Sequence, residues 1–300
     1  MAKIMICDKM DQGAIDEIKK RWGADVIIGQ SVEDLTKNIE PYEAVVIRSA
    51  TKVRTPSIDA GKNLRVVIRG GVGIDNIDHE YARGKGVDVR NTPNASSDGV
   101  SEIALAHMFS LARNLHKSNV TMRKGEWLKK QYKGIELAGK TLGIIGIGRI
   151  GQSLAKKANA LGMTVIAFDK FVEKSPLDFV EMKKCIDCLL ASSDFVSLHI
   201  PKSGDGYVIG APELAKMKDG AYLINAARGG VVDEKALLDA LNSGKIAGAG
   251  VDVWEKEPTD NVDPPKHENV CCTPHLGASS AESQKRVGTE VISVLAEYFN

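Results

Sequence analysis

Short apolar runs alternate with amphipathic segments along most of the chain. In residues 1–100 the runs are rich in valine and isoleucine and nearly continuous in their apolar character. Such runs, separated by segments with helical spacing of apolar residues, are typical of a parallel sheet covered on both faces. A second alternation of the same kind begins at Thr141. The pattern therefore predicts an α/β protein with two parallel-sheet domains.

The predicted elements can be placed by residue number. We expect strands at residues 3–7, 25–28, 43–47, 64–68, 86–89, 142–145, 164–168, 194–199, 221–225, 248–252 and 270–274. We expect helices or helical turns at residues 14–22, 31–39, 55–62, 79–86, 150–161, 182–191, 211–217, 233–243 and 281–299.

One further helix is predicted from Ser101 to Met122, because Ala104, Met108, Leu111 and Leu115 repeat at helical spacing. His107 lies within this run, and we expect it to be a packing or surface residue. The connection that follows contains Trp127 and Tyr132. These aromatic residues are predicted either to pack locally against the long helix or to form a subunit contact.

Composition excludes several classes of protein. The chain has 300 residues, is 43% hydrophobic and 26% charged, and carries a net charge of +1. This balance lacks the basic footprint of a nucleic-acid-binding protein, and no apolar run approaches the length of a membrane span. The N-terminal residues do not resemble a signal peptide. We therefore expect a cytoplasmic protein with no nucleic-acid or membrane partner.

Five cysteines are scattered along the chain, and an odd number argues for a reducing compartment rather than a disulfide framework. Cys185 and Cys188 form a CxxC pair, but no second pair or suitably spaced histidine follows to complete a zinc site. We expect buried thiols on one face of a helix, and no bound metal.

The run TLGIIGIGRIG, from Thr141 to Gly151, leads from a strand into a helix, and a second strand ends at Asp169. This is the complete dinucleotide-binding fingerprint of a Rossmann domain. Gly146 permits the turn, Gly148 lets a pyrophosphate approach, and Gly151 allows close packing of the helix. Asp169 would bind the ribose hydroxyls and repel a 2′-phosphate, which favours NAD over NADP, although Lys170 weakens that preference slightly.

Three charged residues follow later strands: Arg228 in NAARGG, Glu257 in DVWEKEP and His275 in TPHLGASS. Reduction of a 2-oxo acid needs a proton donor for the carbonyl oxygen, and histidine titrates near neutrality. A neighbouring carboxylate favours the imidazolium form. A guanidinium orients the substrate carboxylate with two aligned donors. The trio therefore predicts hydride-transfer chemistry on a 2-hydroxy or 2-oxo acid.

These motifs, together with VIRSATKV and RGGVGIDNID in the first half, resemble the D-isomer-specific 2-hydroxyacid dehydrogenase family over nearly the whole chain. The resemblance implies that Arg228, Glu257 and His275 are catalytic. It implies cofactor contacts at Val72, Gly146, Gly148, Arg149, Ile150, Gly151, Asp169, Ala226, Ala227, Arg228, Asp252, His275, Gly277 and Ala278. Asp252 matches the acid that contacts the nicotinamide amide, and Ala226 and Ala227 match residues on the nicotinamide side.

The resemblance also implies an organisation of the chain. A Rossmann NAD-binding domain at residues 98–279 is expected as an insertion in a flavodoxin-like substrate-binding domain, made of residues 1–97 and 280–300. Ligands are expected in a cleft between the domains, which would close on hinges near residues 94–99 and 277–280. A homodimer formed through the long helix and the Trp127 connection is implied as well.

Residues in the first half of the chain must determine which substrate is bound. Candidate substrate-binding residues are Arg48, Ser49, Lys52, Arg69, Gly71, Val72 and Gly73, with Arg228 and His275 from the second half. Several cations near a small-acid pocket suggest a second anionic group, such as a phosphate. Lys52 and Arg54 could equally be solvated surface residues. RSATKV and RGGVGIDNID are most similar to the D-3-phosphoglycerate dehydrogenase branch, whose reaction leads to serine.

Two departures qualify that resemblance. The chain ends at Asn300, so we expect no C-terminal regulatory domain and no feedback inhibition by serine. Gly70 stands where an alanine usually follows the loop arginine, which leaves the pocket shape open. A hydroxypyruvate or glyoxylate reductase is the enzyme alternative, and an NAD-sensing protein like the corepressors that share this trio is a more remote one.

Overall fold

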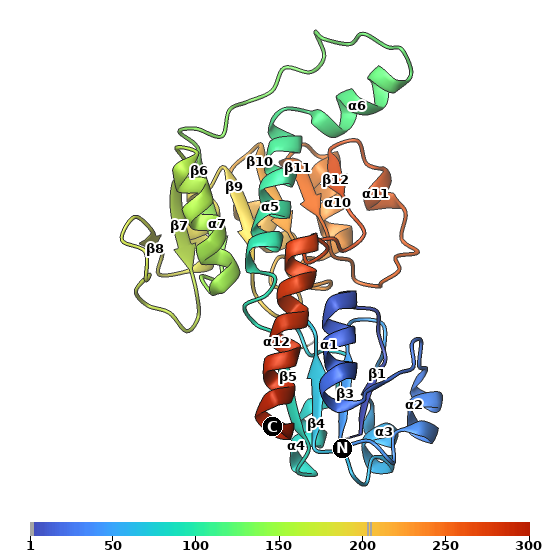
Figure 1. The fold of residues 1–300 in the computed structure, drawn as a ribbon. Helices are drawn as coiled ribbons and strands as arrows, with labels where there is room; N and C mark the ends of the chain where they lie inside the picture. The colour runs from blue at the N-terminus through green and yellow to red at the C-terminus, as the bar shows by residue number, and fades with distance from the viewer. Residues whose placement is uncertain (1–2, 203, 205) are drawn as a thin grey trace. The chain divides into compact units, whose positions relative to one another are not determined.

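The structure is a computed structural model that describes residues 3–202, 204 and 206–300. The chain divides into two compact units (Figure 1): unit 1 comprises the residues up to Ser97 together with Ala278–Asn300, and unit 2 comprises Asp98–Gly277. The chain therefore passes back from unit 2 to unit 1 between Gly277 and Ala278, whereas the sequence predicted this second crossing after residue 279.

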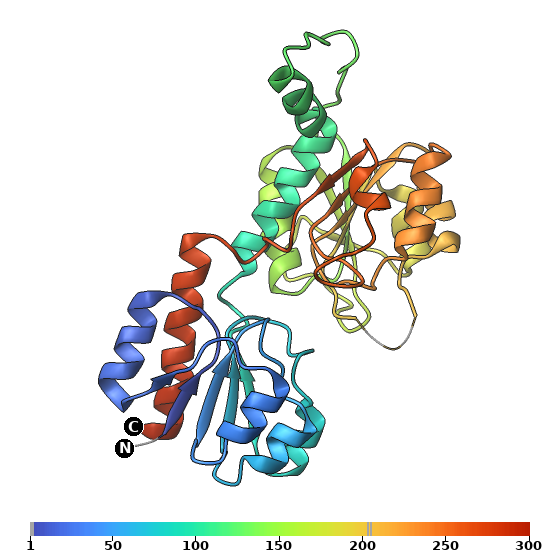
Figure 2. The same ribbon diagram turned by 90° about the vertical axis from the view of Figure 1, so that its right-hand side faces the viewer.

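Unit 1 is built on a five-stranded parallel sheet in the order β2-β1-β3-β4-β5, which is the flavodoxin-like order. Its strands are β1 (Ile4–Ile6), β2 (Asp25–Val26), β3 (Ala44–Ile47), β4 (Val66–Arg69) and β5 (Asp88–Asn91). Helices α1 (Gln12–Trp22) and α12 (Ala281–Phe299) cover one face, and α2 (Val32–Asn38), α3 (Thr55–Ala60) and α4 (His79–Gly84) cover the other (Figure 2).

Local signals in the sequence account for the packing of α1 on α12. Asp11 caps the first turn of α1 by accepting the Ala14 N–H at 3.0 Å, and Gly23 ends the helix in the left-handed conformation. Gly288 of α12 faces α1 so closely that a Cβ there would lie 2.4 Å from the Ala14 Cβ. The last helix of the chain is therefore an integral layer of unit 1.

Unit 2 is built on a seven-stranded parallel sheet in the order β12-β11-β10-β9-β6-β7-β8. Its strands are β6 (Thr141–Ile145), β7 (Thr164–Phe168), β8 (Glu181–Met182), β9 (Phe195–Leu198), β10 (Ala221–Asn225), β11 (Ile246–Val251) and β12 (Val270–Cys272). Helices α5 (Ser97–Ala112) and α7 (Arg149–Ala160) pack on one face. Helices α8 (Ile186–Ser192), α9 (Ala211–Lys216) and α10 (Glu234–Asn242) pack on the other, and α11 (Asp263–Lys266) contacts β12.

The predicted fold class is confirmed, because both sheets are parallel and the second has Rossmann topology around the central pair β6 and β9. No helix among the described residues is long and apolar enough to span a membrane.

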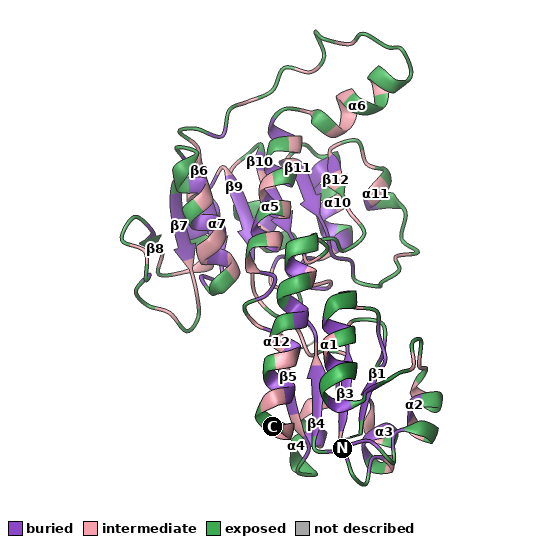
Figure 3. Cartoon of the chain, viewed as in Figure 1, coloured by how far each residue is buried: buried purple, intermediate pink, exposed green. Residues whose placement is uncertain are grey.

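The single long helix predicted for residues 101–122 is wrong. The chain forms α5 and then α6 (Leu115–Arg123), separated at Asn114, which adopts the left-handed conformation with φ 53°. Asparagine tolerates this conformation better than most residues, so it can interrupt a helix. Leu115 is consequently 52% exposed rather than part of the core stripe. Helix α6 has no buried residue (Figure 3), and Trp127 beyond it is 77% exposed, so local packing of Trp127 is also wrong.

The predicted buried thiols at Cys185 and Cys188 are wrong as well. These residues form a disulfide, Cys188 is exposed and Cys185 is half-buried. The expected helix at residues 182–191 begins only at Ile186, because residues 181–182 pair with β7 as a short strand that the sequence did not predict. Cys185 is therefore the extended residue that caps α8 and not a member of a buried helical face.

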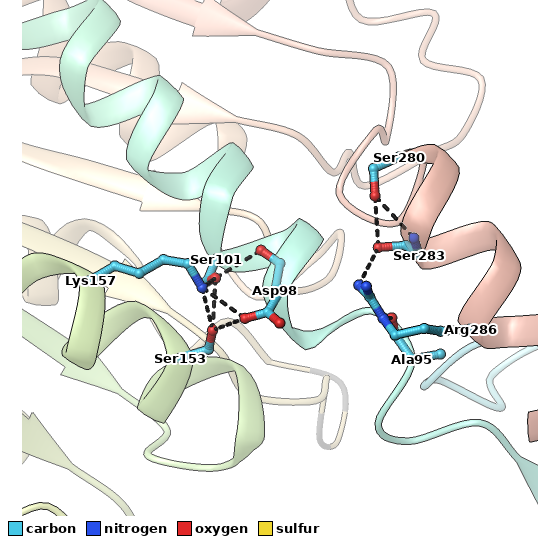
Figure 4. A network of polar contacts seen from close by, with 8 residues as sticks. All are labelled: Ala95, Asp98, Ser101, Ser153, Lys157, Ser280, Ser283 and Arg286. Carbon is cyan, nitrogen blue, oxygen red and sulfur yellow. Dashed lines mark hydrogen bonds and ion pairs between the residues drawn. The ribbon is translucent and has the colours of Figure 1, made fainter.

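The first crossing between the units is anchored by side chains on either side of it (Figure 4). In unit 2, Asp98 accepts hydrogen bonds from Ser153 at 2.7 Å and from Lys157 at 2.8 Å. In unit 1, the Arg286 Nε donates to the Ala95 carbonyl at 2.9 Å. These bonds hold both ends of the predicted hinge at residues 94–99 and leave Ser96 and Ser97 between them.

Candidate active site

The glycine turn after β6 has the geometry that a dinucleotide site requires. Gly146 has φ 96°, and a Cβ there would lie 2.5 Å from the His199 carbonyl oxygen. At Gly151 a Cβ would lie 2.1 Å from the Gly146 carbonyl oxygen, so only glycine lets α7 start this close to the turn. Gly148 by contrast is exposed, and its Cβ position meets nothing within 4 Å.

The N-terminus of α7 can accept an anion. Gly148 occupies the N-cap position, and no side chain of the described residues caps the helix. Arg149 is exposed and Ile150 is partly exposed beside it. Unpaired N–H groups, the positive end of the helix dipole and open space above Gly148 together fit a pyrophosphate.

Asp169 follows β7 at the rim of this turn. Its carboxylate accepts the Ile147 N–H at 3.0 Å and the Phe171 N–H at 2.9 Å. These bonds hold the carboxylate beside the turn, where the fingerprint places a ligand for ribose hydroxyls.

His275 and Glu257 are hydrogen-bonded to each other. The His275 Nδ1 lies 2.7 Å from the Glu257 Oε2, and the two side chains are 40% and 37% exposed. Burial acts to raise the pKa of Glu257, but the hydrogen bonds from His275 and the Trp254 N–H, with the charges of His275 and Arg228, lower it overall. Glu257 is therefore a carboxylate near neutral pH, and it can stabilise a protonated imidazole.

Arg228 follows β10 and is held by its own loop. Its Nη1 donates to the Ala227 carbonyl at 2.7 Å, and its carbonyl accepts from the Asn225 side chain at 3.2 Å. Its charge acts on Glu257, which links it to the same cluster. The strands that precede Arg228, Glu257 and His275 are β10, β11 and β12, which are neighbours in the sheet, so parallel pairing brings the three residues to one edge.

Asp252 is buried, with 1% of its surface exposed. Its carboxylate accepts the Leu276 N–H at 2.7 Å and the Gly277 N–H at 2.8 Å. Ala226 and Ala227 are also buried, whereas Ala278 is partly exposed and lies at the start of the unit 1 segment. In this structure Asp252 therefore holds the loop that carries His275, a role that its position after a strand did not predict.

The substrate candidates of unit 1 lie at the carboxyl ends of β3 and β4, where Arg69 is the last residue of β4. The Arg48 guanidinium donates to the Gln284 side chain and, at 3.3 Å, to the Gly70 carbonyl, and burial lowers the pKa of Arg48. Arg69 lies against Gly71, whose Cβ position is 1.7 Å from the Arg69 Nη1. Ser49 and Lys52 are exposed, while Val72 and Gly73 are partly exposed.

Arg54 belongs to the structure of unit 1 and not to a solvated surface. It forms an ion pair with Asp78 at 2.8 Å, and Asp78 also accepts the Thr55 N–H at 2.8 Å. Lys52, which lies in the loop after β3, is by contrast exposed.

Two residues that the sequence did not single out, Glu234 and Thr273, hold the site together. Glu234 accepts the Glu255 N–H at 2.7 Å and the Asn261 side chain at 3.0 Å, on either side of Glu257. Thr273 donates to Asp252 at 2.5 Å and lies 3.1 Å from His107. Only the proximity of Glu234 and Thr273 to known motifs could have signalled them. Among the described residues, no group of three or more potential metal ligands gathers.

Known proteins share this architecture. The sequence model described as "D-isomer specific 2-hydroxyacid dehydrogenase, NAD binding domain" matches residues 105–277. A hydroxypyruvate reductase of Thermotoga maritima is 42% identical over 297 residues, which covers 97% of this chain and 96% of that protein. A D-3-phosphoglycerate dehydrogenase of Methanocaldococcus jannaschii is also 42% identical, over 97% of this chain but 56% of its own length.

The chain thus spans about half the length of the curated phosphoglycerate dehydrogenases that it matches. Among solved structures, a glyoxylate reductase from Paecilomyes thermophila has a TM-score of 0.90 at 30% identity, covering 99% of this chain and 94% of its own. A D-lactate dehydrogenase from Aquifex aeolicus, complexed with NAD and lactic acid, has a TM-score of 0.87 at 28% identity, covering 99% and 95%.

Proposed function

The chain belongs to the D-isomer specific 2-hydroxyacid dehydrogenase family, whose members it matches over nearly its whole length, and we propose that it oxidises D-3-phosphoglycerate to 3-phosphohydroxypyruvate with NAD. The observation that carries the proposal is the 2.7 Å contact between His275 and Glu257, at the edge of a sheet that also carries the dinucleotide turn. Among the relatives that support the substrate, several carry the name D-3-phosphoglycerate dehydrogenase.

In the proposed reaction, the residues of unit 2 bind the cofactor and handle the proton. The α7 N-terminus and Asp169 would hold NAD, which when bound would supply the acceptor for the hydride on the carbon that bears the substrate hydroxyl. His275 removes the hydroxyl proton through its Nε2, because its Nδ1 is bonded to Glu257. Glu257 stabilises the resulting imidazolium, and the same pair returns the proton in the reverse direction.

Arg228 is proposed to bind the substrate carboxylate. A guanidinium can offer two parallel donors to a carboxylate, which fixes the orientation of the adjacent carbon as well as the charge. The loop bonds that hold Arg228 on the Ala227 carbonyl support this role, because they limit the freedom of the side chain before substrate binds.

Arg48, Arg69 and Lys52 are proposed to bind the substrate phosphate, with backbone N–H groups of Gly71, Val72 and Gly73 nearby and Ser49 contributing a hydroxyl. Lys52 is exposed and available. For Arg48, the bonds to Gln284 and Gly70 would have to be exchanged or shared with the phosphate. The names of the relatives therefore support a phosphorylated substrate more strongly than the contacts of Arg48 do.

Hydroxypyruvate or glyoxylate reduction is the second candidate. The Thermotoga hydroxypyruvate reductase is matched over 96% of its own length, whereas the phosphoglycerate dehydrogenases are matched over about half of theirs. The bonded guanidinium of Arg48 also favours a substrate that does not need it.

A substrate panel with NADH separates the candidates. The values of kcat/KM for 3-phosphohydroxypyruvate, hydroxypyruvate and glyoxylate should be compared at one pH. We expect the phosphorylated acid to be preferred by at least about tenfold, which corresponds to roughly 1.4 kcal/mol. A smaller ratio contradicts the phosphate pocket and favours the reductase. Absence of turnover with all three acids would instead favour an NAD-sensing binding protein.

A homodimer is the proposed assembly. Exposed apolar side chains gather on α6 and the loop that follows it, with Leu115 and Met122 each 52% and Trp127 77% exposed. An exposed apolar set of this kind is typical of a protein interface. Light scattering should give the mass of a dimer, and Trp127→Asp should lower it toward that of a monomer. Phe171→Asp, at an apolar residue that is 88% exposed outside this surface, is the matched control, and an unchanged mass in Trp127→Asp would contradict the interface.

A further inference from the structure

His275 has an unusual backbone conformation that must be maintained by its surroundings. Its φ is 57°, in the left-handed region that residues other than glycine seldom adopt. Such a conformation is unfavourable by itself, so it persists only where neighbouring bonds enforce it. The conformation also directs the imidazole, so whatever holds the backbone of this loop also aims the side chain.

A single residue holds three consecutive amides of the loop. The Asp252 carbonyl accepts the His275 N–H at 2.8 Å. Its carboxylate accepts the next two amides, Leu276 at 2.7 Å through Oδ1 and Gly277 at 2.8 Å through Oδ2. The orientation of the Asp252 carboxylate therefore determines the path of the loop on the C-terminal side of His275.

Thr273 holds that carboxylate from the other side. Its hydroxyl donates to the Asp252 Oδ1 at 2.5 Å. A threonine hydroxyl has one hydrogen, and both oxygens of the Asp252 carboxylate also accept backbone amides, so this hydrogen is committed to Asp252. Toward any other partner, the Thr273 oxygen must act as an acceptor.

The other partner is His107 on α5. Its Nε2 lies 3.1 Å from the Thr273 Oγ1, so Nε2 carries the hydrogen and donates. The ring is 2% exposed, and burial lowers the pKa of His107, which favours the neutral form. Its Nδ1 has no hydrogen-bond partner among the described residues, which is consistent with a bare lone pair rather than a second N–H.

The fold makes room for this histidine. Gly250 of β11 faces α5, and a Cβ there would lie 2.6 Å from the His107 Cβ. Thr273 also reaches the second member of the catalytic pair, because its carbonyl accepts the Trp254 indole N–H at 3.2 Å and the Trp254 backbone N–H donates to Glu257 at 3.1 Å.

We propose that Thr273 and His107 are positioning residues for the reaction: His107 donates to Thr273, Thr273 orients Asp252, and Asp252 holds the loop that aims His275 at the substrate. This inference rests on the proposed function for its effect on turnover. His107 is 2% exposed, and Thr273 reaches the loop through its bond to Asp252, so in this proposal both residues act through the loop.

The test compares variants that remove the hydrogen bonds with variants that retain them. Thr273→Val keeps the shape and loses the hydroxyl, whereas Thr273→Ser retains it. His107→Leu removes the donor, whereas His107→Gln places an amide N–H near the position of Nε2. We expect kcat to fall on the order of 10- to 100-fold in Thr273→Val and His107→Leu, with KM for the oxo acid nearly unchanged, and to recover in Thr273→Ser and His107→Gln.

A second readout does not require turnover. The imidazole Cε1–H resonance of His275, assigned by its loss in His275→Ala, should be single and sharp in the unaltered chain and in Thr273→Ser. It should broaden or split in Thr273→Val. The exposed strand residue Thr164 offers a matched control, because Thr164→Val should change neither kcat nor the resonance.

Three results would overturn the proposal. The first is an unchanged kcat with an unchanged His275 resonance in Thr273→Val. The second is failure of Thr273→Ser to recover the kcat or the sharp His275 resonance that Thr273→Val loses. The third is strict additivity of Thr273→Val and His107→Leu, because residues in one chain of bonds should couple. If the unaltered chain turns over no 2-oxo acid, the proposed function fails, and the resonance comparison still tests the positioning by itself.

Discussion

The loops at the carboxyl ends of the strands differ between the two sheets in what their charged residues bind. In unit 2, His275 and Glu257 bind each other, and both remain more than a third exposed. In unit 1, the Arg48 guanidinium is bonded to Gln284, and Arg54 is paired with Asp78. The first set is pre-organised with its reactive atoms free to meet a ligand. The second set is largely hydrogen-bonded or ion-paired to other residues of unit 1.

This difference suggests a division of labour. In the proposed reaction, proton transfer needs a fixed geometry, which unit 2 would provide through Asp252, Thr273 and Glu234 behind His275 and Glu257. In the proposed reaction, the choice of substrate depends on the cations in the loops of unit 1. The comparison predicts that changes in unit 2 alter the reaction with every substrate, while changes in unit 1 alter the preference among substrates.

The largest effect is expected at His275. His275→Ala should lower kcat by about 10²- to 10⁴-fold, the usual contribution of a general acid or base. NADH should still bind, because the dinucleotide turn is formed by β6 and α7. Stopped-flow kinetics and NADH fluorescence measure the two properties. His79→Ala in unit 1 is the matched control. Loss of NADH binding in His275→Ala would show that His275 is structural instead.

Acid should destabilise unit 2 more than unit 1. Burial lowers the pKa of His199 from 6.5 to about 4, and burial also lowers the pKa of His107 and of His116. His199 as a whole is partly exposed, but its Nδ1 is buried. Between pH 6.5 and 4 the unfolded chain binds a proton at His199 that the folded chain does not bind. Stability is therefore complete above pH 6.5 and falls as the pH drops, by up to about 3 kcal/mol near pH 4.

Amide hydrogen exchange at β9 and β4 between pH 7 and 4.5 measures this loss separately in the two units. Unit 1 contains one histidine, His79, so its protection should change less. His199→Gln should flatten the dependence in unit 2. An identical dependence in that variant would remove His199 as the cause.

A smaller effect is expected from the disulfide between Cys185 and Cys188, which follows β8 in unit 2. Closing so short a loop stabilises a protein by about 2 kcal/mol in the chain-entropy account. A phosphine reductant should therefore lower the free energy of unfolding measured in urea by about that amount. The double variant Cys185→Ser with Cys188→Ser is the control and should not respond. No response of the unaltered chain would mean that the two thiols are free in solution.

Much of the fold followed from sequence pattern because its causes are local. Helix α12 runs from Ala281 to Phe299 as predicted, since Ser280 caps it and an apolar stripe continues along it. The strands before Arg228, Glu257 and His275 were predicted, and their sheet order explains why the three residues meet. The break at Asn114 was missed because the apolar repeat continues through it to Leu115, although no core lies beneath Leu115.

The remaining errors and omissions have non-local causes. The bond from Arg48 to Gln284 joins residues 236 positions apart, which no local pattern encodes. The helix expected at residues 182–191 starts late because residues 181–182 form the edge strand of the sheet. They pair there with β7, which lies earlier in the chain. Thr273 and His107 also belong to distant segments. Their contact depends on how α5 packs on β11 and β12, so no local pattern indicates it.

One crossed measurement tests the division of labour most directly. The values of kcat/KM for 3-phosphohydroxypyruvate and hydroxypyruvate should be determined in the unaltered chain, in Arg69→Ala and in Glu257→Gln, with Lys62→Ala as a surface control in unit 1. Arg69→Ala should lower the ratio of the two values by at least about tenfold, or roughly 1.4 kcal/mol. Glu257→Gln should lower both values by a similar factor and leave their ratio unchanged. A ratio that moves with Glu257→Gln, or stays constant in Arg69→Ala, would contradict the account.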